Sequence, residues 1–236
     1  MMNYFSKLPV FEGKVLECYQ QGFYLFETLY MEKGKIRHAQ LHLKRLQMSL
    51  EKLKWPKHLQ EKELEIWWQE FVNFVEKGQD LRPQRIKLSL IPDFENQKLL
   101  IDLTQVPYHR SEEELLLCFD SEALRHSQDV LWQYKWGERI RMNYFLKKIN
   151  SYADDVIFIN EKNEICETTR HNIVVQIEGK QITPPLCSGL LPGTFRAHLL
   201  QEKQIEEHPI TREELIHAQK IWVCNALTGL HPARII

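Results

Sequence analysis

The spacing of hydrophobic residues changes from a helical period to a strand period within the first half of the chain. Leucines recur at helical steps between positions 43 and 53, which predicts a helix over about 38–54 that ends at Trp55-Pro56. A second apolar set recurs at helical steps between 64 and 75 and predicts another helix. From Ile86 apolar and polar residues alternate, and the alternation resumes at Leu99 after a turn-rich stretch, which predicts two adjacent strands. Helices followed directly by antiparallel strands favour an α+β fold over a doubly wound parallel sheet.

The second half repeats this mixture of helices and hairpins. We expect helices over about 138–151 and 194–204, and strands over 115–119, 156–159, 173–177, 181–183 and 221–224. Thr211 and Glu214 have the spacing of a capping box. The stretch 121–134 is polar and irregular, so we expect a smaller domain over 1–120 and a larger domain over 121–236.

Charge and cysteine content limit the possible classes of function. The chain has 31 basic and 32 acidic residues, so no positive excess is available for nonspecific binding to nucleic acid or to an anionic membrane. The five cysteines are widely spaced and include no C-x-x-C pair, which indicates free thiols in a reducing compartment. The sequence shows no secretory signal and no apolar run long enough for a membrane helix. We therefore expect a cytoplasmic protein.

Local motifs alone identify no site. The sequence contains no dinucleotide or nucleotide phosphate loop, no nucleophile elbow and no zinc-type spacing of cysteine and histidine, so we expect no metal. His42 is a possible ligand, but on general grounds we expect a solvated histidine on a helix.

A series of short motifs in a fixed order is more specific than any one of them. The motifs are Phe26-Glu27-Thr28, His42-Leu43-Lys44-Arg45-Leu46, Tyr134-Lys135, the run 167–173, Thr183-Pro184-Pro185 and the run 189–196. The series resembles the class IV aminotransferases, and the resemblance extends over about 23–232. This family includes branched-chain aminotransferases, D-amino-acid aminotransferases and 4-amino-4-deoxychorismate lyases. The resemblance implies the two-domain pyridoxal-phosphate fold of type IV and pyridoxal 5'-phosphate as cofactor.

The resemblance also assigns the chemistry to three residues. Lys135 is expected to bind the cofactor covalently through its amine and to move the proton at the substrate carbon. Glu167 takes the position of the carboxylate that holds the proton on the cofactor's ring nitrogen. Arg45 takes the position of the arginine that binds the phosphate.

Further cofactor contacts are implied at the start of a helix and in a late loop. Gly193, Thr194 and Phe195 begin the helix at 194, where free backbone amides bind anions. Phe195 stands where the family often has threonine, so the contacts implied here come from the backbone. The resemblance also places Asn172 and Ala226 against the cofactor.

The resemblance leaves the reaction open between two outcomes. Phe26-Glu27-Thr28 and the segment 224–227 are similar to 4-amino-4-deoxychorismate lyases, and Thr28 would bring a hydroxyl near the reacting carbon. Other segments depart from the lyases, including the shortened stretch before Gly22 and Pro92-Asp93 after the strand expected over 86–90. A branched-chain or D-amino-acid transaminase therefore remains the alternative, and a noncatalytic cofactor-binding or interaction protein is an alternative of another class. The implied partners are an amino acid or an aminodeoxychorismate-like substrate and a second copy of the chain in a homodimer.

Overall fold

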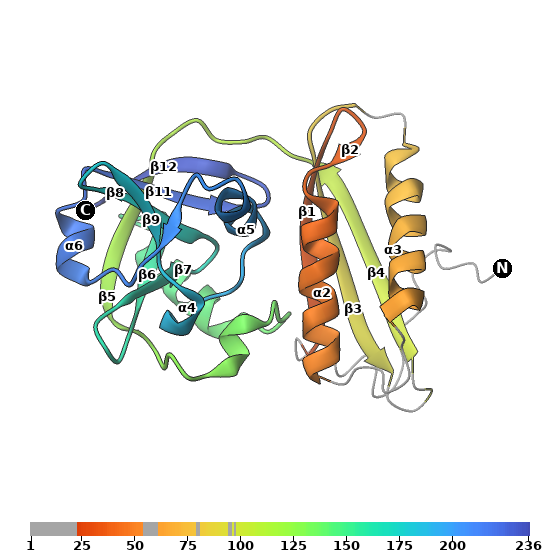
Figure 1. Ribbon diagram of the computed structural model, residues 1–236, viewed down its shortest axis with the longest axis horizontal. Helices are drawn as coiled ribbons and strands as arrows, with labels where there is room; N and C mark the ends of the chain where they lie inside the picture. The colour runs from red at the N-terminus through yellow and green to blue at the C-terminus, as the bar shows by residue number, and fades with distance from the viewer. Residues whose placement is uncertain (1–22, 54–60, 79–80, 94–95, 97) are drawn as a thin grey trace. The chain divides into compact units, whose positions relative to one another are not determined.

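The structure, a computed structural model, describes residues 23–53, 61–78, 81–93, 96 and 98–236 (Figure 1). The described chain forms two compact units, one ending at His109 and including Lys135–Arg139, and one comprising Arg110–Tyr134 and Ile140–Ile236. The division therefore comes before the expected boundary at 120, and the first unit also includes a segment beyond it. Cys18, the N-terminal segment and the helix end expected at Trp55-Pro56 lie outside the described residues.

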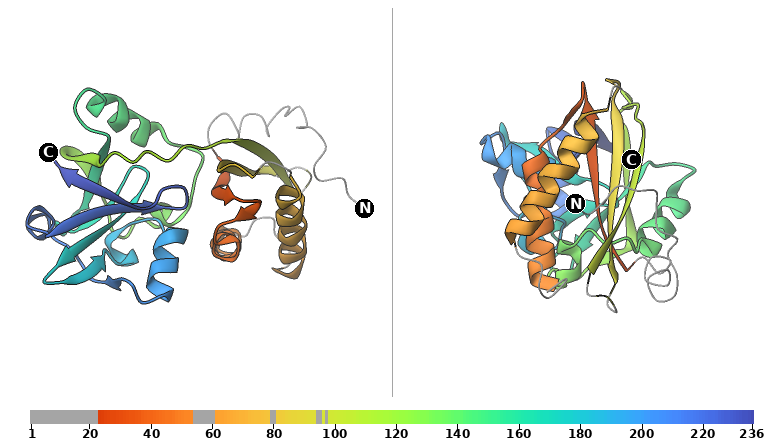
Figure 2. Two further views of the ribbon diagram at one scale, coloured as in Figure 1. Left: turned by 90° about the horizontal axis from the view of Figure 1, so that it is seen from above. Right: turned by 90° about the vertical axis from the view of Figure 1, so that its right-hand side faces the viewer.

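The first unit is a four-stranded sheet with two helices. Its strands are β1 (Leu25–Glu32), β2 (Lys35–Ile36), β3 (Gln84–Asp93) and β4 (Lys98–Pro107), in the order β2-β1-β3-β4, and all pairs are antiparallel. The helices α2 (Ala39–Leu53) and α3 (Glu61–Glu76) lie on the same face of this sheet (Figure 2, left). Both helices and the β3–β4 hairpin were expected from the hydrophobic spacing, and the structure confirms them.

The buried side chains explain why this arrangement forms. Leu43, Leu46 and Leu50 of α2 are buried on one face, as their spacing predicts. Trp68 and Phe71 of α3 are almost fully buried, and their rings lie 5.3 Å apart. Burial of such large apolar side chains stabilises the unit by about 2–3 kcal/mol for each residue.

The second unit is a mixed sheet that closes on itself. Its strands are β5 (Leu115–Arg125), β6 (Asp155–Asn160), β7 (Ile165–Thr168), β8 (Asn172–Ile177), β9 (Lys180–Thr183), β10 (Glu206–Glu207), β11 (Lys220–Asn225) and β12 (Gly229–Ile235). Their order is β10-β9-β8-β11-β12-β5-β6-β7, and β7 also pairs with β8. The pair Glu167 and Asn172 makes this closing contact. The mixture of helices and strands in both units confirms the expected α+β class.

The short strands β2 and β10 were not predicted, and two longer strands also differ from the expectation. The strand expected over 115–119 continues to Arg125, because its register with β6 shifts between Phe119 and Leu124. This irregularity breaks the alternation of apolar and polar residues, so 121–125 looked irregular in the sequence. Strand β12 was not predicted, because Pro232 weakens the strand pattern. The ladder between β12 and β5 begins at Ala233, just after the proline.

Short helices complete the second unit. They are two 3-10 turns, η1 (Val130–Gln133) and η2 (Leu186–Ser188), and the helices α4 (Ile140–Ile149), α5 (Thr194–Gln201) and α6 (Arg212–Ile216). The capping box is confirmed, since the Glu214 backbone N–H donates to Thr211 Oγ1 (3.2 Å) and the Thr211 N–H donates to the Glu214 carboxylate (2.7 Å). Among the described residues, no helix combines the length and apolar character that crossing a membrane requires.

Candidate active site

In the first unit, Lys135 lies in a short segment that runs along the edge of β1. The Phe26 N–H donates to the Lys135 carbonyl (2.9 Å), and the Gly137 N–H donates to the Tyr24 carbonyl (2.8 Å). Position 137 needs glycine, because a Cβ there would lie 2.1 Å from a ring carbon of Tyr24. The Lys135 amine is 4.6 Å from the centre of the Phe26 ring, within the range of a cation–π contact. The backbone thus holds this half-buried lysine against β1.

Three residues from two of the sequence motifs meet in the core of the first unit. Glu27 Oε1 accepts from Arg45 Nε (2.9 Å), and Glu27 Oε2 accepts from Arg45 Nη2, so the ion pair is bidentate. His42 Nδ1 lies 2.6 Å from Glu27 Oε2. The His42 side chain is completely buried, and that of Arg45 is 8% exposed. Arg45, expected to bind phosphate, is therefore paired with a carboxylate to which the sequence analysis assigned no role.

The electrostatics of this cluster follow from burial and pairing. Burial raises the pKa of Glu27, but the charge of Arg45 and the contacts with His42 outweigh it and lower the pKa from 4.5 to about 2. Burial lowers the pKa of His42, against the opposing effect of Glu27. The interpretation of His42 as a solvated side chain is wrong. His42 lies three residues before Arg45 and four before Leu46, so the three side chains share one face of the helix. This spacing was the sequence signal that His42 faces inward.

Thr28 follows Glu27 in β1 and is half-buried. It pairs with Lys87 of β3 in the strand register. Because side chains alternate along a strand, Thr28 shares a face with Phe26, whose ring contacts the Lys135 amine. A place for the Thr28 hydroxyl near the reacting carbon stays a prediction.

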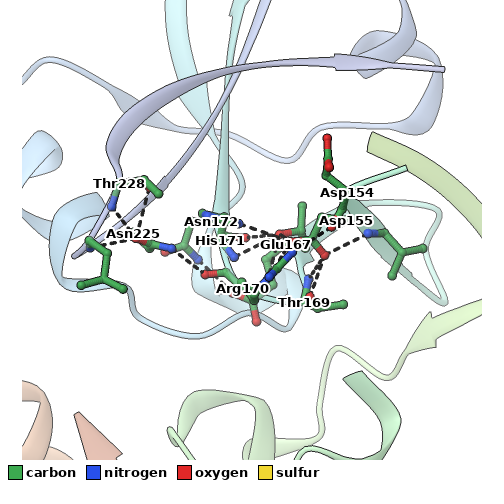
Figure 3. Close-up of polar contacts among 12 residues, drawn as sticks. Asp154, Asp155, Glu167, Thr169, Arg170, His171, Asn172, Asn225 and Thr228 are labelled. Carbon is green, nitrogen blue, oxygen red and sulfur yellow. Dashed lines mark hydrogen bonds and ion pairs between the residues drawn. The ribbon is translucent and has the colours of Figure 1, made fainter. Parts of the chain in front are cut away.

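In the second unit, Glu167 receives hydrogen bonds on both carboxylate oxygens. Arg125 Nη1 donates to Oε1 (2.6 Å), and Asn172 Nδ2 donates to Oε2 (3.1 Å; Figure 3). The Arg125 guanidinium is buried and lies 4.2 Å from the ring centre of Trp132 and 4.3 Å from that of Phe158. Sequence reasoning missed Arg125, which lies in the stretch that looked irregular. The arrangement fixes the position of the Glu167 carboxylate at the end of β7.

The turn between Glu167 and Asn172 is held by the buried carboxylate of Asp155 (Figure 3). Thr168 Oγ1 donates to Asp155 (2.8 Å), and Thr169 donates to it from both its hydroxyl (2.6 Å) and its backbone N–H (3.0 Å). Burial raises the pKa of Asp155, but hydrogen bonds and charges, first those of His171, outweigh burial and lower it. An acidic residue before an apolar strand was the only sequence signal for this role.

Asn172 also connects Glu167 to the start of α5. Its Nδ2 donates to the Leu191 carbonyl (3.0 Å) as well as to Glu167. Gly193 precedes α5 as its N-cap and has itself no side chain to cap the helix. Thr194 is buried and Phe195 half-buried, with the Phe195 ring directed to His198 (5.9 Å between ring centres). Asn172, Gly193 and the start of α5 therefore lie together, and their contact with a cofactor stays a prediction.

The close approach at Gly193 gives a prediction. A Cβ at 193 would lie 1.9 Å from Asn172 Oδ1, so Gly193→Ala must displace an amide that is anchored at Leu191 and Glu167. We expect a loss of about 1–3 kcal/mol in the free energy of unfolding, measured with urea. In the double variant with Asn172→Ala the obstacle is gone, so adding Gly193→Ala to Asn172→Ala should cost much less. Additive losses would contradict this account.

The loop after β11 is closed by the side chain of Asn225. Asn225 Oδ1 accepts from the backbone N–H of Leu227 (2.8 Å) and of Thr228 (2.9 Å), and Nδ2 donates to the Arg170 carbonyl (3.2 Å; Figure 3). Ala226 is half-buried in this turn. The loop is thus tied to the turn that follows Glu167, and contact of Ala226 with a cofactor stays a prediction.

Comparisons with known proteins identify the family of the chain. The family model for amino-transferase class IV matches residues 24–236. A Haemophilus influenzae protein without a functional name is 26% identical over 206 residues, which are 87% of this chain and 98% of the relative. An aminodeoxychorismate lyase of Vibrio harveyi is 29% identical over 111 residues, which are 44% of this chain and 41% of the lyase.

A solved structure shows the same fold. The PLP-bound form of a hypothetical aminotransferase from Mycobacterium tuberculosis matches with a TM-score of 0.79 at 16% identity, covering 97% of this chain and 86% of its own. The family model covers nearly the whole chain, and the family binds pyridoxal phosphate. The protein belongs to the class IV aminotransferase family.

Proposed function

We propose that this protein is a pyridoxal-phosphate-dependent enzyme of the 4-amino-4-deoxychorismate lyase type. The observation that carries the cofactor proposal is the buried Glu167 carboxylate, which Arg125 and Asn172 hold in one orientation. The relative named aminodeoxychorismate lyase supports the choice of reaction. The class IV aminotransferase description of the family supports a branched-chain or D-amino-acid transaminase as the second candidate.

The side chains present have the chemistry that the cofactor needs. Lys135 offers an amine for the covalent link, and Arg45 offers a guanidinium for the phosphate. The backbone at Gly193 has no side chain to obstruct a phosphate, and the first amides of α5, at Thr194 and Phe195, are donors of the kind that bind anions. Asn172 and the loop with Ala226 complete the proposed set. The residues therefore fit pyridoxal 5'-phosphate.

Each proposed role is a simple chemical task. The bound cofactor supplies an electron sink for the carbanion that forms at the substrate carbon. Lys135 takes the proton from that carbon, and in the lyase reaction it gives the proton to the departing pyruvate as a general acid. Glu167 holds a proton on the ring nitrogen through a charge-assisted hydrogen bond. Thr28 is proposed to place its hydroxyl near the reacting carbon.

The experiment that separates the candidate reactions supplies aminodeoxychorismate to the purified full-length protein loaded with cofactor. A lyase eliminates pyruvate and leaves an aromatic amine, without any keto-acid acceptor. A transaminase instead converts L- or D-amino acids to keto acids and depends on an acceptor. We expect pyruvate release from aminodeoxychorismate, and amino-group transfer without elimination would replace the lyase by the transaminase.

A third result would exclude an enzyme. A protein that remains colourless after incubation with pyridoxal phosphate, and converts none of these substrates, would favour a noncatalytic interaction protein. The homodimer implied by the family resemblance is part of the proposal, and light scattering after gel filtration measures it.

A further inference from the structure

The buried Glu27 carboxylate controls the direction of the Arg45 side chain. Glu27 holds both Nε and Nη2 of Arg45, and the Glu27 side chain is only 3% exposed. A guanidinium is planar and carries five N–H donors, so fixing two of them fixes the plane and direction of the other three. We propose that Glu27, supported by His42, is the positioning residue that directs Arg45 to the cofactor phosphate. This inference rests on the proposed function.

The negative charge of Glu27 keeps the Arg45 side chain in place at neutral pH. Burial raises the pKa of Glu27, but the Arg45 charge and the His42 contact outweigh burial and lower the pKa to about 2, so the carboxylate is an ionised acceptor at neutral pH. His42 Nδ1 is hydrogen-bonded to Glu27 Oε2, and this contact limits rotation of the carboxylate group. The network also joins strand β1 to helix α2, two rigid elements of the first unit. Arg45 thus lacks the rotamer freedom of a solvated arginine.

Glu27 has a second effect that opposes the first, since its negative charge partly neutralises Arg45. Removing that charge would strengthen phosphate binding if the guanidinium stayed in place. Only 8% of the Arg45 side chain is exposed, however, and a buried cation that loses its counter-ion moves toward water. We therefore expect loss of direction to dominate, so that Glu27 favours phosphate binding.

The test compares two probes that differ only in the phosphate. Apo full-length protein is titrated with pyridoxal 5'-phosphate and with pyridoxal, and the ratio of the two affinities isolates the phosphate contribution. Glu27→Gln should lower this ratio about tenfold and leave the affinity for pyridoxal unchanged within about twofold. In an Arg45→Met background, Glu27→Gln should leave the ratio unchanged, because no guanidinium remains to be directed.

A matched control removes another ion pair of the same unit. Glu76 binds Lys35 (2.7 Å) at the end of α3, and Glu76→Gln should keep the wild-type ratio. An unchanged or higher ratio in folded Glu27→Gln would overturn the inference, as would an equal loss in the Arg45→Met background. A wild-type protein that binds the two probes equally would instead reject the phosphate role of Arg45 and with it that part of the proposed function.

Two substitutions of His42 test the positioning role of Glu27 if Glu27→Gln does not fold. His42→Leu removes one partner of Glu27 and fills the buried space with an apolar side chain, whereas His42→Asn keeps an N–H donor near the position of Nδ1. We expect His42→Leu to lower the ratio about threefold and His42→Asn to restore most of it. Equal ratios in wild type and both variants would overturn the inference.

Discussion

Replacement of Lys135 by alanine should end covalent attachment of the cofactor and lower turnover by roughly 10⁴-fold. In the proposed function the variant lacks both the amine that binds the cofactor and the base that moves the substrate proton, and general acid–base catalysis alone contributes up to about 10⁴-fold. The fold should persist, because the segment is held to β1 by backbone hydrogen bonds that alanine retains. Loss of the cation–π contact with Phe26 should cost about 0.5–1 kcal/mol.

Borohydride reduction of the loaded protein, followed by peptide mass mapping, locates the attachment. Wild type should carry the reduced cofactor on Lys135, and the Lys135→Ala variant should carry none. Lys147 is exposed on α4, so Lys147→Ala is a matched control that should keep the label and the activity. A label on Lys147 or Lys148 would refute the assignment of Lys135.

The variant Glu167→Gln should fold, retain the cofactor and turn over about a hundredfold more slowly. A glutamine still forms hydrogen bonds but cannot hold the ring-nitrogen proton by charge, and the lost stabilisation is realised mainly in the transition state. A hundredfold corresponds to about 2.7 kcal/mol in the barrier. The proposed phosphate contacts and lysine link, which would retain the cofactor, should be unaffected.

The Glu167→Gln variant should also be less stable than wild type, because the substitution disturbs the contacts of Glu167. In the Glu167→Gln variant the amide oxygen can still accept from Arg125, but the amide NH2 group would face the Asn172 Nδ2 donor. The free energy of unfolding should therefore fall by about 1–3 kcal/mol in a urea titration. Single-turnover decay of the cofactor absorption band measures the rate, with exposed Glu202→Gln as control. Wild-type rates in Glu167→Gln would remove Glu167 from the site.

The spacing of residues predicted much of the fold, because amphipathic elements carry their own pattern. Helix α2 begins and ends within about one residue of the expected helix, since its leucines form a continuous apolar face. The prediction of strands failed where the local pattern of apolar and polar residues does not reflect the strand pairing in the sheet. The register shift breaks the alternating pattern at the end of β5, and Pro232 breaks it in β12, so neither segment was predicted as a strand. Both are nevertheless paired with neighbouring strands in the sheet.

The motifs by themselves determined the family and drew attention to Lys135, Arg45, Glu167 and the start of α5. They could do so because chemical roles require particular side chains in a particular order, which is visible without coordinates. Only the tertiary structure decided which groups pair with them. Glu27 and Arg125 are the carboxylate and guanidinium that bind Arg45 and Glu167, across 18 and 42 positions of the chain. Such partners are set by how strands and helices pack, because a buried charge must find its counter-ion in space, and no local pattern records that distance.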